Sequence, residues 1–454
     1  MKNVSEKMIK NHKGITLLVL VITIVILIIL STVTISAVFG DGGLIEQSKQ
    51  THSDATNMMY SREENMNKLM QEYSNMMDEE EGIENPNLND IENPNQNEIV
   101  DPGTDPDEPT IPEDWNKDKV TATESEDGKM VPVPVGYVGS KASGENTVIG
   151  GFVIYEGEEE VTDSNVATAK TSRNQFVWVP VEDINDIAKL TSGYDTAGRL
   201  NYQGKLYNFS SGGATEMSGY GQGTTAYREP DIVTKYDNDT SNMSVLGLAS
   251  GNALKQQLQL DFNEIVASVE KYGGFYIGRY ETGDISRTAV KEPKVVKGQS
   301  TMPFATWYYI YASTRLLNAN SNVKTTMIWG SMWDRTLIWI AETNEESQGK
   351  NGKSYPEIVN SVSWGNYATS VGGTGARKNS GYSEAWKANN IYDLAGNACD
   401  WTIEANGADY RMLRGGDYKS DTTTGFSAHR YNYKPNDYYM NLAFGSRASL
   451  YIVP

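Results

Sequence analysis

Cysteine and histidine are scarce in this sequence. Its 454 residues include one cysteine, Cys399, and three histidines. A single cysteine excludes an intramolecular disulfide framework and a cysteine-rich zinc site. His12, His52 and His429 lie far apart in the sequence, which leaves little material for a histidine-based metal site or catalytic triad. Lys and Arg form no rich run beyond the N-terminus, which argues against nucleic acid as a partner.

Negative charge is concentrated in one segment. The net charge is −20, and residues 78–118 contain fifteen Asp and Glu against one Lys. This segment is rich in Asn and Pro and nearly lacks aromatic residues, so it cannot bury enough apolar surface to offset the entropy lost on ordering. We predict a disordered, self-repelling linker over residues 78–118, with a root-mean-square span of roughly 35 Å.

One long uncharged run lies near the N-terminus. Residues 15–39 carry no charge across 25 residues, and as a helix they would span roughly 37 Å, enough to cross a bilayer. Four lysines precede the run, while Asp41 and Glu46 follow it. The positive-inside rule then predicts a single-pass protein with a cytoplasmic N-terminus and an extracytoplasmic, cell-surface C-terminal part. The run is too long for a secretory signal.

The residues at the start of this run add a second interpretation. Lys13-Gly14-Ile15-Thr16, which opens the apolar helix after a short basic leader, resembles the prepilin-type N-terminus of type IV pilins and pseudopilins. The resemblance implies a leader over residues 1–14, cut by a prepilin peptidase between Gly14 and Ile15. That family usually has Glu five residues after the cut, where this chain has Val19, which argues against assembly into a filament core. An uncleaved single-pass anchor stays open.

A helical stalk is predicted over residues 40–77. Apolar residues recur at spacings of three, four and seven, which forms one stripe on a polar helix: Ala55, Met59, Met66, Leu69, Tyr73 and Met76. The stripe suits packing on a partner or on the head, and a loose, solvated helix is the alternative, because methionine specifies packing weakly.

Residues 119–454 have the pattern of a folded head. Short β-prone stretches between glycines predict strands in residues 130–139, 150–157, 174–181 and 273–281, and residues 253–272 and 332–343 predict helices. Polar connections such as Ser210–Asn242 separate them. The mixture predicts an α+β domain with many loops.

Seven motifs in order resemble the formylglycine-generating enzyme (sulfatase-modifying factor) family, whose fold is a variant of the C-type lectin fold. The most specific are Tyr-Asp-x-x-Gly-Asn-x-x-Asp-Trp at 392–401 and Leu-Arg-Gly-Gly at 413–416. The insert between Asp183 and Ala253 has no counterpart in that family. The full set is Asn174–Val181, Gly273–Gly283, Met302–Ala312, Met327–Ile340, Asn390–Trp401, Arg411–Tyr418 and Phe444–Tyr451.

Cys399 does not match the catalytic cysteines of this family. Those cysteines follow the Arg-Gly-Gly motif, and no residue from Arg411 to Pro454 is a cysteine. Cys399 instead takes the place of the first Trp in Gly-Asn-x-Trp-Glu-Trp, so we predict a small buried packing residue. No pairing of nucleophile and base can be assembled from the remaining residues, which disfavours an enzyme.

The turn around Cys399 carries a metal prediction. In the family this turn binds calcium through two side-chain oxygens and two backbone carbonyls, which correspond here to Asp393, Gly396, Ala398 and Asp400. Asp400 stands where the family has Glu, and both offer hard oxygen ligands. A turn with solvated carboxylates and no ion is the alternative.

Tyrosine and asparagine are dense in residues 417–441. Binding surfaces favour this mixture, because tyrosine offers large contact area with a polar tip and asparagine offers adaptable hydrogen bonds. The resemblance places this segment on an exposed ligand face, the part diversified in retroelement-targeted variable proteins that share the fold. The alternative is that these tyrosines pack into the domain. The predicted ligand-binding residues are Tyr418, Tyr431, Tyr433, Asn436, Tyr438 and Tyr439.

Together these features predict a membrane-anchored, non-catalytic adhesion protein whose head binds a surface protein or glycan. Two alternatives stay open: an enzyme of the formylglycine-generating type, and a structural minor pilin or pseudopilin.

Overall fold

The computed structural model describes the C-terminal part of the chain. The chain divides into two units, Met1–Ile99 and Val100–Pro454, and every described residue belongs to the second. The predicted leader, transmembrane helix and stalk, with most of the linker, lie outside these residues. Within the described ranges, no helix is both long and apolar enough to cross a membrane. These ranges are residues 112, 114–194, 198–217, 234–301, 305–317, 320–346, 352–369, 373–420, 426–437 and 444–454.

A six-stranded antiparallel sheet forms the centre of the head. Its strand order is β11-β18-β10-β5-β4-β3, and β5, β10 and β18 are almost completely buried. The continuous apolar runs that predicted several of these strands therefore reflect burial on both faces. The strands are β3 (Tyr137–Gly139), β4 (Val153–Glu156), β5 (Gln175–Pro180), β10 (Gly274–Gly278), β11 (Val323–Met327) and β18 (Ala448–Ile452).

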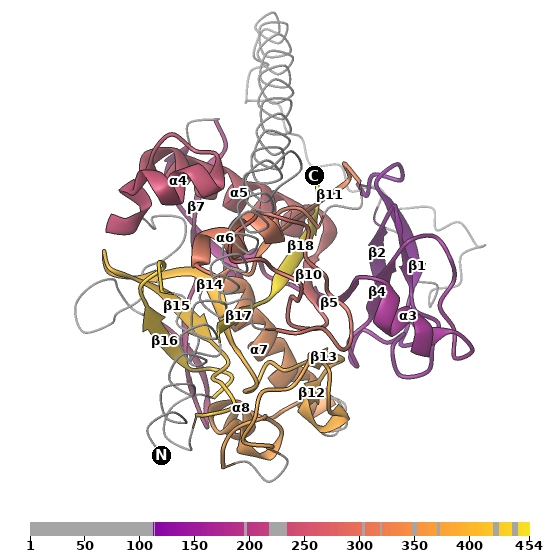
Figure 1. The fold of residues 1–454 in the computed structure, drawn as a ribbon. Helices are drawn as coiled ribbons and strands as arrows, with labels where there is room; N and C mark the ends of the chain where they lie inside the picture. The colour runs from indigo at the N-terminus through magenta and orange to yellow at the C-terminus, as the bar shows by residue number, and fades with distance from the viewer. Residues whose placement is uncertain are drawn as a thin grey trace, which may run out of the picture. The chain divides into compact units, whose positions relative to one another are not determined.

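The two faces of this sheet pack against different partners. In β5, Val177 and Val179 belong to the larger core, which also contains the apolar face of α5 (Gly251–Tyr272). Phe176 and Trp178 belong to a second core on the other face. That core includes side chains of the hairpin β1 (Val120–Glu124) and β2 (Met130–Pro134). Figure 1 shows α5 and this hairpin beside the sheet.

Helix α5 has a clear start and end in the sequence. The Ser250 side chain accepts a hydrogen bond from the Ala253 N–H at its N-terminus, and Gly273 adopts φ 77° at its C-terminus, a conformation that glycine takes without strain. The other helices are α3 (Val166–Ser172), α4 (Thr240–Leu246), α6 (Trp307–Thr314), α7 (Gly330–Glu346) and α8 (Tyr355–Val359).

A second sheet of four strands carries several of the residues singled out in the sequence, among them Cys399, Asp400, Tyr431 and Tyr433. Its order is β16-β15-β14-β17, and β17 pairs with β14 in parallel. Its strands are β14 (Cys399–Asn406), β15 (Tyr410–Arg414), β16 (Arg430–Tyr433) and β17 (Phe444–Ser446) (Figure 1). The remaining hairpins pair β6 (Ala188–Tyr194) with β7 (Leu200–Gly204), β8 (Tyr207–Ser210) with β9 (Gly213–Glu216), and β12 (Lys387–Ala388) with β13 (Ile391–Tyr392).

The structure confirms an α+β head, including the predicted strands and both predicted helices. One expectation is wrong: Ser210–Asn242 is not only a polar connection, because it contains β9 and the start of α4. The Asp239 side chain caps α4, whose Met243 and Leu246 are buried. Trp115, which falls within the range given to the linker, packs its ring 6.3 Å from that of Tyr272, so the folded part begins earlier than the sequence indicates.

Candidate functional site

The turn between β13 and β14 is held by residues with unusual backbone angles. Asp393 and Asn397 adopt φ values of 59° and 66°, in the left-handed region that Asn and Asp tolerate best among residues with a side chain. Gly396 has φ 77°, and a Cβ there would lie 2.3 Å from the Asn366 carbonyl oxygen. Only glycine fits this close approach. The turn directs both candidate carboxylates, Asp393 and Asp400, into the protein.

Both carboxylates are buried, with exposed fractions of 1% for Asp393 and 0% for Asp400. The alternative of a turn with solvated carboxylates is therefore wrong. Asp393 Oδ2 accepts a hydrogen bond of 2.8 Å from the Gly381 N–H, and Asp400 Oδ2 accepts one of 3.1 Å from Arg447 Nε. The other oxygen of each, Asp393 Oδ1 and Asp400 Oδ1, has no hydrogen-bond partner among the described residues.

A third buried carboxylate, Glu281, joins this cluster. Its two oxygens accept hydrogen bonds from the Ala398 N–H at 3.0 Å and from Asn397 Nδ2 at 2.7 Å. Burial raises the pKa of Glu281 well above its usual range, and repulsion from Asp393 and Asp400 raises it further. Burial also raises the pKa of Asp393 and of Asp400, although Arg447 opposes both shifts. Three buried acids thus share one neighbouring guanidinium, and burial favours their protonated, uncharged forms.

Two oxygen atoms at this turn, Asp393 Oδ1 and Asp400 Oδ1, have the chemistry that a hard cation prefers. Calcium prefers oxygen ligands, and the two carboxylate oxygens without a partner are the type of group that such an ion satisfies. Against this, Arg447 already pairs with the Asp400 carboxylate. The described residues also contain no group of three or more His, Cys, Asp or Glu side chains placed to hold a metal. Gly396 and Ala398 are the residues whose backbone carbonyls were predicted as ligands. Gly396 donates its N–H to the Gly415 carbonyl at 2.8 Å, and Ala398 is buried. The calcium assignment remains a proposal.

Cys399 is a core residue. It is 6% exposed and lies in the larger hydrophobic core, opposite Phe444 in the parallel pairing of β14 with β17. Burial raises the pKa of its thiol well above the usual value, and the carboxylates of Asp417, Asp400 and Glu281 raise it further. The thiolate is therefore disfavoured, as expected for a packing residue rather than a nucleophile.

The predicted ligand segment is centred on β16. Tyr431 is 44% exposed, whereas Tyr433 is partly buried with its ring 4.7 Å from that of Phe444. The rings of Tyr431 and Tyr433 are 5.3 Å apart. Tyr431 therefore faces solvent, and Tyr433 packs on the core.

Of the other predicted ligand residues, two lie in the described part of the chain and two do not. Tyr418 and Asn436 are partly buried, and Asn436 Oδ1 accepts a hydrogen bond of 2.8 Å from Asn242 Nδ2 of α4. Tyr438 and Tyr439 lie outside the described residues.

A largely buried network of four charges links β16 to α7 and β14. Arg414 pairs with Asp334 at 2.6 Å and with Glu404 at 3.3 Å, and Arg430 pairs with the same two acids. Arg430 Nη1 also donates to the Tyr207 carbonyl of β8 at 2.6 Å. The sequence pointed to Arg414 through its Leu-Arg-Gly-Gly motif, but it gave no signal for the partners, which come from α7, β14 and β16.

His429 lies next to this network and next to Tyr431. Its ring centroid is 5.9 Å from that of Tyr431. Burial lowers the pKa of His429 to about 4, and the positive charges of Arg414 and Arg430 contribute to the shift. His429 is therefore neutral at neutral pH, and it contributes an uncharged aromatic ring beside the exposed tyrosine.

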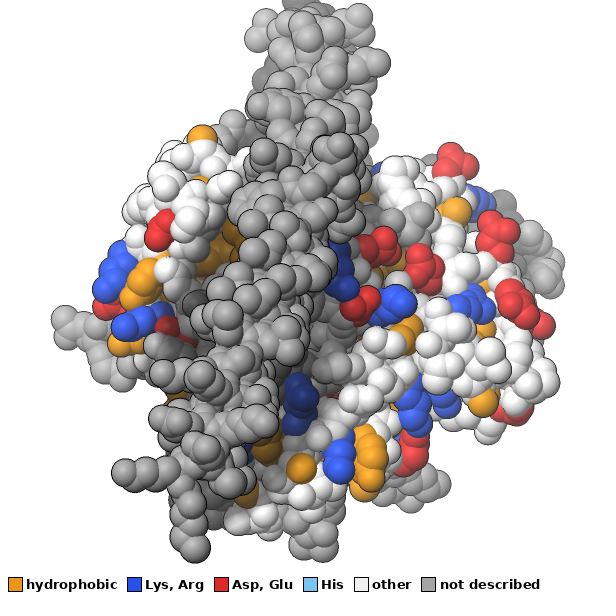
Figure 2. Space-filling view, viewed as in Figure 1, with side chains coloured by type: hydrophobic (Ala, Val, Ile, Leu, Met, Phe, Trp, Pro, Cys, Tyr) orange, Lys and Arg blue, Asp and Glu red, His pale blue; other side chains and the backbone are white. Residues whose placement is uncertain are grey.

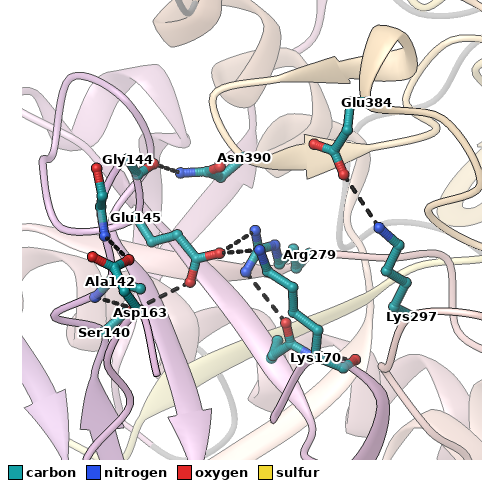
Figure 3. A network of polar contacts seen from close by, with 12 residues as sticks. Ser140, Ala142, Gly144, Glu145, Asp163, Lys170, Arg279, Lys297, Glu384 and Asn390 are labelled. Atoms are coloured by element: carbon teal, nitrogen blue, oxygen red, sulfur yellow. Dashed lines mark hydrogen bonds and ion pairs between the residues drawn. The ribbon is translucent and has the colours of Figure 1, made fainter. Parts of the chain in front are cut away.

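A second polar network links the loop between β3 and β4 to α3 and to the end of β10 (Figure 3). Glu145 bonds Arg279 at 2.7 Å and Lys170 at 2.8 Å. Burial raises the pKa of Glu145, but attraction and hydrogen bonds from Arg279 and Lys170 outweigh it and lower the pKa to about 2. Asn390, which precedes the carboxylate turn, donates to the Gly144 carbonyl at 2.7 Å. This hydrogen bond links the loop that carries Glu145 to the residue before β13.

Comparisons with known proteins add little. No protein-family profile and no curated protein sequence matches the chain. Among solved structures, the Treponema denticola variable protein 1 is similar at 12% sequence identity, over 63% of this chain and 97% of that chain. The TM-score of this match is 0.23, which is too low to indicate a shared fold.

Proposed function

We propose that this chain is a membrane-anchored, cell-surface binding protein whose head recognises a partner without catalysis. The observation that carries this proposal is Tyr431, a large aromatic side chain that is 44% exposed on a strand rather than on a loop. Rigid aromatic side chains supply contact area at low entropic cost, and they dominate the energy of many interfaces.

The surroundings of Tyr431 support a binding role. The buried Arg414–Asp334 and Arg430–Glu404 pairs hold the strand in place, so little order has to be gained when a partner binds. Figure 2 shows acidic and basic side chains dispersed over the visible face of the described residues, without a field of one sign. A mixed surface of this kind suits a specific contact better than attraction to a polyanion.

The non-catalytic part of the proposal rests on Cys399. The only thiol in the chain is buried, and its pKa is raised, which opposes the chemistry of an activated cysteine. Calcium at Asp393 and Asp400 would neutralise buried negative charge and stiffen the turn that leads into β14. This role is structural, and the ion would be no part of the contact with a partner.

The anchor and its processing are proposed from the sequence alone. The uncharged run at 15–39 would hold the protein in the membrane, and Gly14-Ile15 would be the processing site. The acidic linker would then keep the head away from the membrane surface.

One screen tests the binding role. The unit Val100–Pro454, which forms a compact body with its own cores, would be applied to arrays of cell-surface proteins and glycans, with and without calcium. We expect a defined partner whose binding is lost in Tyr431→Ala. Turnover of a cysteine-containing peptide by the same unit would contradict the proposal.

A further inference from the structure

Tyr382 presents an exposed aromatic ring away from β16. It is 60% exposed, and its ring stacks on that of Trp386, with centroids 5.5 Å apart and 29° between the ring planes. Trp386 is only 1% exposed and is the last residue of the short helix η4 (Glu384–Trp386). A buried indole thus supports a solvent-facing aromatic platform.

The backbone on both sides of Tyr382 is held in place. The Gly381 N–H donates a hydrogen bond of 2.8 Å to the buried Asp393 carboxylate. On the other side, the Ser383 side chain caps η4 by accepting a hydrogen bond from the Ala385 N–H. The ring is therefore positioned before any ligand arrives, which reduces the ordering cost of binding.

Charged side chains surround this platform. The Lys378 ammonium lies 5.0 Å from the centroid of the Tyr382 ring. Lys387 and Lys297 both pair with the Glu384 carboxylate, at 3.0 and 3.2 Å, and Figure 3 shows Lys297 and Glu384 pointing toward one another. With three lysines against one glutamate, the surroundings of the ring carry an excess of positive charge.

Two of these lysines are placed beside the ring by contacts of the chain. The backbone of Lys378 is bonded twice to the buried Asn397 side chain, through its N–H at 2.9 Å and its carbonyl at 3.1 Å. The stem of Lys297 lies against Gly381, where a Cβ would be 3.3 Å from Lys297 Cγ. Both ammonium groups are thus tied to the segment that carries Tyr382.

Glu384 supplies an acceptor on the same surface. Its side chain is 60% exposed, and Glu384 Oε2 accepts a hydrogen bond of 2.5 Å from the Tyr392 hydroxyl. Burial raises the pKa of Glu384, but the hydrogen bonds from Tyr392 and Lys387, with the charges of Lys387 and Lys297, lower it to about 2. The carboxylate is therefore ionised at neutral pH and accessible to a hydroxyl group of a ligand.

This combination matches the chemistry of a sugar that carries a carboxylate. One face of a pyranose ring consists of C–H groups and packs on an aromatic ring, while a few polar groups around that ring fix its orientation. The hydroxyls of the sugar donate to a carboxylate, and its own carboxylate pairs with an ammonium. A simple anion would use neither the ring nor Glu384, and a neutral sugar would leave the excess of positive charge unused.

From this geometry we propose that the Tyr382 platform binds an acidic sugar, either a hexuronic acid or a sialic acid residue of a glycan. The sugar ring stacks on Tyr382, the sugar carboxylate pairs with Lys378, and Glu384 accepts a hydrogen bond from a sugar hydroxyl. This site is separate from Tyr431 and goes beyond the proposed function, because the partner recognised through Tyr431 is a different molecule.

The test is an NMR titration of the unit Val100–Pro454 with the methyl glycosides of glucuronic, galacturonic and N-acetylneuraminic acid. Methyl glucoside and methyl galactoside are the matched neutral probes, and acetate supplies the carboxylate without a sugar ring. We expect at least one acidic glycoside to bind about tenfold or more tightly than each neutral probe and than acetate.

Matched variants supply the second arm. Tyr382→Ala should weaken binding of the acidic glycoside about tenfold or more, whereas Tyr382→Phe, which keeps the ring, should stay within about twofold of the wild type. Lys378→Gln should remove the preference for the acidic over the neutral sugar. Tyr194→Ala, at a tyrosine of β6 that is 70% exposed, should bind like the wild type. Melting curves of all variants show whether any loss follows unfolding, and Tyr382→Phe preserves the packing on Trp386.

Four results would overturn the proposal: no acidic glycoside binds, a neutral probe or acetate binds as tightly as the best acidic glycoside, folded Tyr382→Ala binds like Tyr194→Ala, or Lys378→Gln keeps the preference for acidic sugar. None of them bears on Tyr431, whose partner is sought in a separate screen. Failure of the acidic-sugar site and failure of the proposed function are therefore distinguishable.

Discussion

Replacing Asp334 by Asn should destabilise the head strongly. Asp334 and Glu404 share two guanidiniums, those of Arg414 and Arg430, and the side chains of Asp334, Glu404 and Arg414 are fully buried. The wild-type cluster is balanced, with two negative and two positive charges. Asp334→Asn keeps the shape of the side chain but leaves two guanidiniums facing one carboxylate.

The expected cost follows from that uncompensated charge. Removing one partner of a buried ion pair costs about 3–5 kcal/mol, which is a large fraction of the 5–15 kcal/mol that typically stabilises a domain. Burial and repulsion from Arg430 already lower the pKa of Arg414, so the cluster tolerates little further positive charge. We expect the free energy of unfolding in urea to fall by about 3–5 kcal/mol.

Two controls separate this effect from general fragility. Asp284→Asn breaks an exposed ion pair with Lys291, whose side chains are 43% and 44% exposed, and should cost less than about 1 kcal/mol. The double variant Asp334→Asn/Arg430→Met restores charge balance and should regain part of the loss. The reasoning would be refuted if Asp334→Asn lowered the free energy of unfolding by less than about 1 kcal/mol. It would also be refuted if Arg430→Met lowered the stability of Asp334→Asn by the full cost expected at an independent site.

Three further predictions concern the carboxylates and the anchor. If calcium binds at Asp393 and Asp400, chelation should lower the melting temperature of the wild type but hardly that of Asp393→Asn, since a ligand at a hundredfold excess over its Kd stabilises by about 2.7 kcal/mol; identical melting curves with and without chelator would leave the turn without an ion. The pKa of Glu145 is lowered from 4.5 to about 2, so its contribution to stability should be complete above pH 4.5 and be lost as the pH falls towards 2. Glu145→Gln should show a smaller fall in unfolding free energy across this window, and an unchanged slope would argue against the Arg279 pairing. Gly14→Val should block cleavage before Ile15 in the native host, as read by N-terminal sequencing, whereas a wild-type protein with an intact leader would leave a plain anchor.

The sequence predicted the elements whose burial is continuous along the chain. Val177, Phe275 and their neighbours form unbroken apolar runs, because both faces of the central sheet are covered, and α5 shows its apolar spacing and its Gly273 end. Cys399 was also predicted correctly as a buried residue, since a free cysteine behaves as a small hydrophobic side chain.

Features that depend on contacts between distant residues could not be predicted. Glu281 lies far from Asp393 in sequence, and only the folded chain brings their carboxylates together. Asp237, which caps the start of η2 (Lys235–Asn238) and pairs with the buried Arg411 at 3.0 Å, belongs to an insert that looked like a polar connection. Trp115 was hidden in an acidic segment whose composition outweighed one aromatic residue.

The most direct test of the account is the affinity of Tyr431→Ala for the partner found in the array screen, measured beside Tyr382→Ala. Both tyrosines are exposed, at 44% and 60%, but Tyr382 stacks on Trp386 and lies outside β16. The account predicts a loss of about 2 kcal/mol for Tyr431→Ala, roughly a 30-fold weaker Kd, with an unchanged melting temperature. It predicts wild-type affinity for Tyr382→Ala. Equal binding by both variants, or a loss for Tyr431→Ala only in step with unfolding, would contradict a binding face on β16.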